Sequence, residues 1–590
     1  MKDTPLTAAR LLALYDQVAG AEDAIPRLRR FVLDLAVRGK LVAQDAGDEP
    51  AAELLKRIAM EKARLGSKKE KVAPTLLTKA EEPFRIPKSW HWVRLSEILT
   101  KLTDGTHHSP PSGQFGDYLY ITAKNIKKEG VLLDDVTYVS KAVHDEIFSR
   151  CNPEQGDILY IKDGATTGVV TINDIAQPFS MLSSVALLKL PSCLFNRLIA
   201  EFLRSPFFFD QMRGFMKGSA IPRVTLSRMG PALFPLPPLA EQRRIVGRVE
   251  ELMALCDQLQ AARAGERAVR DRLTTATLSR LTDPDQPPES APQNARFALH
   301  SLPTLTTHPA QIKTLRQTIL NLAVRGKLVE QEASDEPATA LQNKLRKSKE
   351  VLLKSRTIRN QKVTTTPIDA EATFEIPQLW KWVRLGELVS LLGGYAYKSA
   401  TYVPKEGNQI IRLGNVKNDE VLHYQRPAYI SDEIARQTAD FEILKDDILV
   451  TMTGTKGKRD FVFTARVKDS DLTQGRLFLN QRVGAIRPFN SDIVPLINLF
   501  LKSDILLDWI FETATGTANQ ANIGVSSILD LPFPLPPLAE QHRIVAKVDA
   551  LIALCDQLEA SLTTATTTRQ RLLTALLHEA LEPAAALEPA

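Results

Sequence analysis

Cysteine is scarce in this sequence, with four residues in 590, and long apolar runs are missing. The cysteines form no C-x-x-C pair and no cluster with histidine at metal-ligand spacing, so we expect neither a disulfide framework nor a metal site. The longest apolar stretches, such as 496–501, fall far short of the roughly 20 residues that a membrane helix needs. The sequence also opens without the basic and then apolar pattern of a secretion signal. We therefore expect a multidomain cytoplasmic protein with no membrane contact.

Enzyme signatures are missing too. The sequence holds no GxxxxGK[ST] loop, no GxSxG elbow, no HExxH helix and no GxGxxG turn after a strand. It also lacks the Asn-Pro-Pro-Tyr or Asp-Pro-Pro-Tyr motif of base methylation and any evident nuclease Asp/Glu-x-Lys cluster. The formal charge of +6 permits a polyanionic partner but is too mild to identify one. Binding, with no catalytic residues, is the better prediction.

What the sequence does contain is a long internal repeat. Four blocks recur in the same order: Leu-Ala-Val-Arg-Gly-Lys-Leu-Val at 35–42 and 322–329, Asp-Glu-Pro at 48–50 and 335–337, Trp-x-Trp-Val-Arg-Leu at 90–95 and 380–385, and Leu-Pro-Pro-Leu-Ala-Glu-Gln at 236–242 and 535–541. Their offset drifts only by small insertions, so the chain is a duplication rather than a solenoid. Between these blocks the copies diverge, which indicates one scaffold with two differently specified surfaces.

Each copy has helical periodicity near its start, at 51–65 and 338–354, and then a compact α/β domain over 84–235 or 374–534. In these domains short β-rich runs alternate with Gly, Pro and Asn turns. The runs are 118–122, 157–161 and 168–172 in the first copy, and 410–413, 447–452 and 461–467 in the second. The predicted segments are a helical region 1–82, α/β domain 83–235, long helix 236–282, proline-rich linker 283–293, helical region 294–372, α/β domain 373–534, and long helix with tail 535–590.

The two predicted long helices carry apolar residues at alternating steps of four and three. The seam residues are Ile245, Val249, Leu252, Cys256 and Leu259 in the first copy, and Ile544, Val548, Leu551, Cys555 and Leu558 in the second. A heptad seam needs a partner helix. We predict that the two helices pack within one chain as an antiparallel coiled coil that separates the α/β domains and gives the repeat pseudo-twofold symmetry. Pairing between chains would produce the same pattern. Cys256 and Cys555 are expected to be buried small hydrophobes rather than reactive thiols.

Polar loops that follow the β-rich runs are candidate contact sites. The basic turn with Lys456, Lys458 and Arg459 could hold phosphates, and a solvated hairpin fits it equally well. Its Gly-Lys pair lacks the earlier glycine of a nucleotide-binding loop, where Met452 stands. Two corresponding loops, one in each copy, carry side chains that could reach base edges. Ordinary divergence between duplicated loops would also explain why these side chains differ. These are Thr106, His107 and His108, and then Tyr395, Tyr397 and Lys398.

A second group of polar residues precedes each long helix or ends a β-rich run. Arginine can bridge guanine O6 and N7, and asparagine or glutamine can bridge adenine N6 and N7. Arg223, Asn519 and Gln520 are therefore candidate base readers, with turn stabilisation as the alternative. Cationic candidates are Lys124, Lys162, Lys217 and Arg412, whereas Asn125 and Asn415 could simply cap turns. The paired tryptophans at 90, 92, 380 and 382 could stack on unpaired bases, but core packing is the better interpretation.

Two diverged α/β domains, each followed by Pro-Leu-Pro-Pro-Leu-Ala-Glu-Gln-x-Arg-Ile-Val, resemble the specificity subunits of Type I restriction-modification systems, the HsdS family, over essentially the full chain. The Gly-Asp-Ile-Leu run at 156–159, which reads Asp-Asp-Ile-Leu at 446–449, supports the resemblance. It implies that 84–235 and 374–534 are target recognition domains, each of which binds half of an interrupted DNA site. The diverged copies predict unequal half-sites.

The resemblance also implies the partners. One such chain joins two methyltransferase (M) subunits and further endonuclease and translocase (R) subunits on double-stranded DNA. The partners, not this chain, would bring S-adenosylmethionine, ATP and Mg²⁺. Two alternatives remain at this point: the separated recognition subunit of another restriction-methylation system, and a structural coiled-coil assembly protein.

Overall fold

The computed structural model describes residues 20–65, 82–214, 223–283, 291–365, 368, 374–404, 408–473, 475–516 and 520–581. The chain divides into two compact units. Unit 1 holds residues 1–266 and 566–590, and unit 2 holds residues 267–565. Each unit therefore contains one α/β domain, the first part of the long helix that follows it, and the last part of the other long helix.

The helices outside the α/β domains are α2 (Ala24–Val37), α3 (Ala51–Arg64) and α9 (Leu239–Thr282), followed by α10 (Ala291–Leu305), α11 (Pro309–Val324), α12 (Ala338–Lys354) and α17 (Leu538–Leu581). Helices α3, α9, α12 and α17 occur where the periodicity predicts them, and α2, α10 and α11 are additional. Helix α10 begins inside the predicted linker, and its Pro292 lies in the first turn, where proline leaves no hydrogen bond unmade. No helix within the described ranges is long and apolar enough to cross a membrane.

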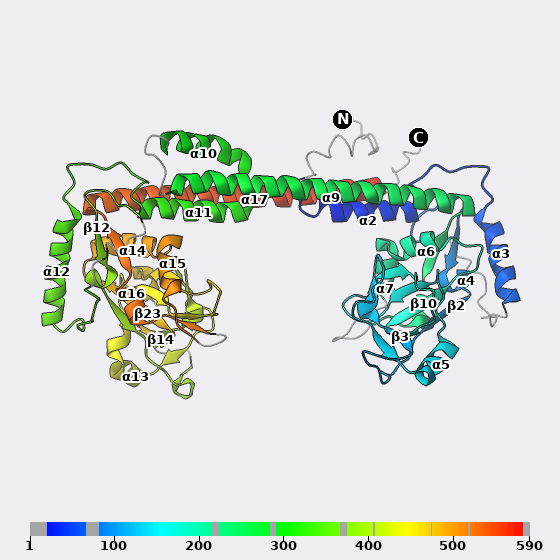
Figure 1. Ribbon diagram of the computed structural model, residues 1–590, viewed down its shortest axis with the longest axis horizontal. Helices are drawn as coiled ribbons and strands as arrows, with labels where there is room; N and C mark the ends of the chain where they lie inside the picture. Colours follow the sequence, from blue (N-terminus) through cyan, green and yellow to red (C-terminus); the bar gives the residue numbers. More distant parts are fainter. Residues whose placement is uncertain are drawn as a thin grey trace, which may run out of the picture. The chain divides into compact units, whose positions relative to one another are not determined.

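The seam of each long helix is buried against a shorter helix as well as against the α/β domain. In unit 1, α2 lies along α9, and Val32 packs in the same core as Ile245 and Val249 (Figure 1). Earlier in α2, Ala24 packs with Leu573 near the end of α17. The long helices of this unit thus pack together with α2.

Unit 2 has the equivalent arrangement around α11. Ile319 of α11 shares a core with Val548 and Cys555 of α17. The Gln311 side-chain amide, also on α11, donates to Asp271 Oδ1 of α9 at 2.8 Å. The requirement for a partner helix is confirmed, and the sequence reading missed only that α2 and α11 take part. Cys256 and Cys555 are buried, and burial raises the pKa of both thiols, as expected for unreactive side chains.

The α/β domain of unit 1 contains a four-stranded sheet between helices and a smaller sheet. The four-stranded sheet has the order β2 (Lys101–Asp104), β10 (Val185–Lys189), β7 (Ile158–Ile161), β8 (Val170–Ile172). The smaller sheet has the order β6 (Thr137–Val139), β3 (Tyr118–Ile121), β9 (Ser180–Met181). The pairs β1 (His91–Arg94) with β11 (Leu233–Leu236) and β4 (Ile126–Lys127) with β5 (Gly130–Val131) complete it. Its helices are α4 (Leu95–Ile98), α5 (Lys141–Arg150), α6 (Asn196–Leu203), α7 (Pro206–Gly214) and α8 (Leu226–Met229).

The α/β domain of unit 2 repeats this plan. One four-stranded sheet has the order β13 (Val389–Gly393), β23 (Val483–Pro488), β19 (Ile448–Thr451), β21 (Thr464–Arg466). A second four-stranded sheet has the order β17 (Tyr429–Ile430), β14 (Asn408–Ile411), β22 (Leu477–Leu479), β18 (Glu442–Ile443). Three pairs are added: β12 (Lys381–Arg384) with β25 (Pro532–Leu535), β15 (Val416–Lys417) with β16 (Glu420–Val421), and β20 (Thr453–Gly454) with β24 (Ala521–Asn522). The helices are α13 (Asp432–Gln437), α14 (Val494–Phe500), α15 (Asp504–Glu512) and α16 (Val525–Leu529).

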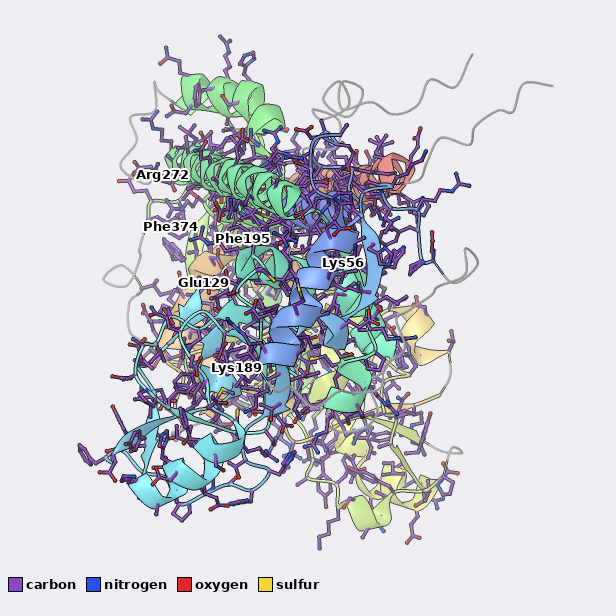
Figure 2. The ribbon with its side chains drawn as sticks, turned by 90° about the vertical axis from the view of Figure 1, so that its right-hand side faces the viewer. Lys56, Glu129, Lys189, Phe195, Arg272 and Phe374 are labelled. Atoms are coloured by element: carbon purple, nitrogen blue, oxygen red, sulfur yellow. The ribbon has the colours of Figure 1, made fainter. Side chains whose placement is uncertain are left out.

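The central strands are apolar throughout because both of their faces are covered. Alternate residues of a strand point to opposite faces. In β7, Ile158 and Tyr160 pack in the core that contains α6 and α7, whereas Leu159 and Ile161 pack in a second core with β3 and β9. The backbone N–H of Phe195, which precedes α6 and is labelled in Figure 2, donates to Gln242 Oε1 of α9 at 3.3 Å. The domain is thereby fixed to the start of its long helix.

The recurring sequence blocks meet where each long helix begins. Trp90 Nε1 donates to Glu241 Oε2 at 2.9 Å, Gln44 Nε2 donates to Glu241 Oε1 at 2.6 Å, and Arg244 pairs with Asp48 at 2.5 Å. Burial raises the pKa of Glu241, and the two donors oppose that shift. The equivalent contacts in unit 2 are Trp380 to Glu540 at 2.9 Å, Gln331 to Glu540 at 2.6 Å, and Arg543 to Asp335 at 2.6 Å. The tryptophans are thus core residues, as expected.

Candidate nucleic-acid interface

Several loops of the first α/β domain leave its sheet at one end. The C-terminal residue of β2, Asp104, pairs with Ala186, and the C-terminal residue of β7, Ile161, pairs with Val185 at the start of β10. Strand β8 begins at this end as well, because Val170 pairs with Tyr160. The loops that follow β2 and β7 and precede β10 and β8 therefore emerge side by side, like the active loops of many α/β folds.

Backbone hydrogen bonds tie these loops to one another. The Thr106 N–H donates to the Met181 carbonyl at 2.9 Å, and the Ser183 N–H donates back to the Thr106 carbonyl at 2.8 Å. The Leu182 N–H donates to Ile121 at the end of β3 at 3.0 Å, which brings the turn with Lys124 to the same place. Gly105 permits this approach, because a Cβ there would lie 1.9 Å from the Met181 oxygen.

The second α/β domain has the same backbone frame. The Tyr395 N–H donates to Leu479 at 2.9 Å, the Gln481 N–H donates to Tyr395 at 2.9 Å, and the Asn480 N–H donates to Ile411 at 3.1 Å. A Cβ on Gly394 would lie 2.0 Å from the Asn480 oxygen. The Thr106 and Tyr395 loops, which the sequence matched only loosely, thus occupy equivalent positions with different side chains.

The segment that precedes each long helix joins the same end of the sheet. In unit 1 the Val224 N–H donates to the Lys162 carbonyl at 2.9 Å. In unit 2 the Ile523 N–H donates to the Met452 carbonyl at 3.0 Å, and β20 pairs with β24. The structure thus places Arg223 and Gln520, two of the predicted base readers, at this end of the sheet. Lys217 and Asn519 lie outside the described residues.

A charged cluster stands at this end of unit 1. Lys162 is buried, and its Nζ lies 3.4 Å from Asp104 Oδ2 and 3.3 Å from Asp163 Oδ2. Arg150 contacts Asp104 Oδ1 at 3.3 Å, and Arg223 Nε contacts Asp163 Oδ1 at 3.3 Å. Two carboxylates thus hold three cations, which leaves one excess positive charge. A buried lysine cannot itself reach DNA, so Lys162 organises the cluster.

Unit 2 has no such cluster among its described residues, because Met452 and Thr453 stand where unit 1 has Lys162 and Asp163. Its cations are instead at the surface: Lys398, Lys456 and Lys458 are exposed. Exposed lysines suit phosphate contacts.

The two predicted arginines of unit 2 are committed to contacts within the domain. Arg459 pairs with Asp508 and with Asp504 at 3.6 Å, and its guanidinium lies 5.3 Å from the centre of the Phe511 ring. Arg412 donates to the Arg426 carbonyl. Their engagement makes them weaker candidates for DNA contact than the three exposed lysines.

Some predicted site residues are buried and act on the loop backbone. Asn125 Oδ1 accepts from the Thr122 N–H at 3.1 Å, and its amide donates to two carbonyls of the following turn. Asn415 makes the same three contacts, beginning with the Arg412 N–H at 3.0 Å. These asparagines cap turns, which was one of the two interpretations. Tyr397 is also buried, and its hydroxyl donates to Thr438 Oγ1 at 3.0 Å.

Other predicted residues are open to solvent. His107 and His108 are exposed; His107 Nε2 lies 3.2 Å from Asp104 Oδ1, and His108 Nδ1 lies 3.1 Å from the buried Thr106 hydroxyl. Lys124 pairs with Asp135 at 3.0 Å at the surface. Tyr395 stays exposed beside the Tyr397 ring.

The sequence reading missed residues that only the fold brings to this end. Ser184 and Arg482 are equivalent, because their carbonyls accept from Lys162 and Met452, and Arg482 is an exposed cation. Asn522 is exposed and pairs across β20 with Thr453. Alignment of the two copies across the block before each long helix would have placed Asn522 opposite Arg223. Among the described residues, no group of three or more His, Cys, Asp or Glu could hold a metal ion.

Comparisons with known proteins identify the family of this chain. The family model described as the Type I restriction modification DNA specificity domain matches residues 87–265 and 377–565. The specificity subunits of the Type I restriction enzymes EcoEI and EcoAI from Escherichia coli are each 32% identical over 584 residues, which cover 94% of this chain and 94% of theirs.

A crystal structure of the HsdS subunit from Thermoanaerobacter tengcongensis aligns over 85% of this chain and 99% of the HsdS chain, with 17% sequence identity and a TM-score of 0.38. Family membership is shown by the family model and the curated relatives. The two family matches cover both α/β domains and the start of both long helices, and the relatives span nearly the whole chain. The chain therefore belongs to the Type I restriction-modification DNA specificity family and is a specificity subunit, the non-catalytic, DNA-recognising member of a Type I complex.

Proposed function

We propose that this chain reads an asymmetric, interrupted DNA sequence, with one half-site bound by each α/β domain. The observation that supports this most directly is the shared backbone frame at the sheet end, which carries a paired ionic cluster in unit 1 and exposed lysines in unit 2. One scaffold with two different sets of side chains is what unequal half-sites require. The recognition segments are 83–235 and 373–534, and the remaining predicted segments hold and connect them.

The contacts divide into two kinds. Exposed cations such as Lys124, Lys398, Lys456 and Lys458 bind phosphates and supply salt-dependent affinity. Side chains that offer hydrogen-bond donors or acceptors at this end of the sheet read base edges in the major groove. These are the exposed residues His107, His108, Arg223 and Tyr395, together with the half-buried Gln520. The residues that position the loops and do not contact DNA themselves are the buried Thr106, Asn125, Lys162, Tyr397 and Asn415.

The chain acts in the cytoplasm as the single specificity subunit of its complex. Its start-of-helix blocks recur once per unit, which supports two equivalent docking places for two methyltransferase subunits, with endonuclease subunits added for cleavage. S-adenosylmethionine, ATP and Mg²⁺ are held by those partners.

A domain exchange tests the proposal. Residues 84–235 are replaced by the equivalent domain of another family member, and the methylated DNA motif is determined in cells that also express the methyltransferase partner. We expect one half-site to change and the other to remain. Exchange of 374–534 serves as the matched control and should change the other half-site. An unchanged motif after both exchanges would favour a purely structural role for the domains.

A further inference from the structure

One position in the candidate interface is structurally equivalent in the two domains and differs in chemistry. Asp163 forms a backbone bridge with Arg223, and Thr453 forms one with Asn522. The next residues, Val224 and Ile523, donate to the carbonyls of Lys162 and Met452. The backbone therefore places Arg223 and Asn522 at the same point relative to each sheet.

From this equivalence we propose that Arg223 reads a guanine in one half-site and that Asn522 reads an adenine at the corresponding place in the other. Arginine bridges the two acceptors of guanine, O6 and N7, whereas the asparagine amide matches the donor and acceptor of adenine, N6 and N7. The inference rests on the proposed function and adds the base read at one position of each half-site.

Arg223 is held in a suitable orientation. Its Nε lies 3.3 Å from Asp163 Oδ1, and 63% of its side chain is exposed. Asp163 is itself fixed by the buried Lys162 at 3.3 Å. Among the described residues the ion pair with Asp163 is the side-chain contact of Arg223, and its two terminal nitrogens make no hydrogen bond there. Pre-orientation lowers the entropy that the side chain loses on binding.

Asn522 is held by its backbone. Its N–H donates to the Thr515 carbonyl at 2.7 Å, and its own carbonyl accepts from the Thr515 N–H at 3.0 Å. The side chain is exposed, and its Oδ1 accepts from Gln520 Nε2 at 3.3 Å. This contact orients the Asn522 carboxamide and leaves its Nδ2 and the second lone pair of Oδ1 for the N7 and N6 groups of adenine.

A phosphate contact does not explain both residues. Phosphate binding selects for cations, and unit 2 already exposes Lys456, Lys458 and Arg482 near this end of the sheet. Asn522 is neutral and is placed with the same backbone precision as Arg223. A position that carries a guanidinium in one domain and an amide in the other suits the reading of different bases.

The test uses the full chain in complex with its methyltransferase subunits, and DNA selected from a pool with randomised half-sites. In Arg223→Asn, the preference for guanine at one position of one half-site should fall by roughly ten- to a hundredfold, while the other half-site stays as in the wild type. In Asn522→Arg, the loss should affect adenine at one position of the other half-site. Arg197→Asn is the matched control, because Arg197 is 60% exposed but pairs with Glu250 on α9.

Wild-type base preferences in both variants would overturn the inference. So would an equal loss of affinity for all sequences with a weaker salt dependence, since that is the behaviour of a phosphate contact. A wild-type complex that selects no motif at all would instead refute the proposed function, so the two failures are distinguishable.

Discussion

Replacement of Lys162 by methionine removes the central cation of the unit 1 cluster. The Lys162 side chain is only 6% exposed and lies between two carboxylates, Asp104 at 3.4 Å and Asp163 at 3.3 Å. Methionine has a similar length and already occupies the equivalent position in unit 2, as Met452. The change therefore preserves the packing volume and tests the charge alone.

The expected cost follows from what remains around the carboxylates. Loss of one partner from a buried ion pair typically costs ~3–5 kcal/mol, because the remaining charge stays desolvated. Here Arg150 and Arg223 remain within 3.3 Å of Asp104 and Asp163, but they are 50% and 63% exposed and compensate only in part. We therefore expect a loss of about 2–3 kcal/mol, which for a unit of this size lowers its melting temperature by roughly 4–8 °C.

Scanning calorimetry of the full chain measures this shift. The double variant Lys162→Met/Asp163→Thr recreates the Met452-Thr453 pair of unit 2 and removes one of the two carboxylates that Lys162 had compensated, so it should recover at least half of the loss. Met452→Leu is the matched control in unit 2 and should leave the unit 1 transition unchanged. A Lys162→Met chain that melts within about 1 °C of the wild type would refute the expected role of this charge, and so would a double variant that is less stable than the single one.

Three further changes test other parts of the structure. Burial raises the pKa of Asp34 from 3.8 to about 6, so its ionised form destabilises the native state as the pH rises from about 4 to 7. Asp34→Asn should therefore increase the free energy of unfolding by up to about 3 kcal/mol at pH 8 and change it little at pH 4, as measured by urea unfolding. Gly105→Ala should cost about 1–3 kcal/mol or more in the same assay, because its Cβ meets the Met181 carbonyl, whereas Gly247→Ala, with open space around its Cβ, should not destabilise the chain. Trp90→Phe removes the donor to buried Glu241 and should cost about 1–3 kcal/mol in urea unfolding; an unchanged midpoint would show that this contact does not fix the start of α9.

The sequence was informative wherever the physical cause is local or repeated. Period and composition predicted α3 and α12 almost to the residue, and the apolar runs at 157–161 and 447–452 predicted the central strands β7 and β19. The recurring blocks predicted the duplication, and the structure gives a reason for their recurrence: Trp90 and Glu241 form one buried contact, and Trp380 and Glu540 form its equivalent. Core packing of the tryptophans followed from the same pattern.

The arrangement of the candidate interface was less accessible because it depends on long-range pairing. Nothing in the local sequence places Thr106 beside Met181 or Arg223 beside Asp163; the register of β2, β10 and β7 does so. Burial of Lys162 and Asn125 is also a tertiary property, and it turns two candidate contact residues into positioning residues.

The long-helix seam shows the same limit. Its period requires a partner helix but carries no information on which helix provides it. The structure adds α2 in unit 1 and α11 in unit 2, whose own apolar residues gave no separate signal. Partner choice depends on the contacts of the whole unit.

The most direct test of the central claim is genome-wide adenine-methylation sequencing of cells that express the methyltransferase partner with and without this chain. We predict an interrupted, asymmetric methylated motif that appears only when the chain is present. An active methyltransferase whose methylation pattern is the same without the chain would contradict it.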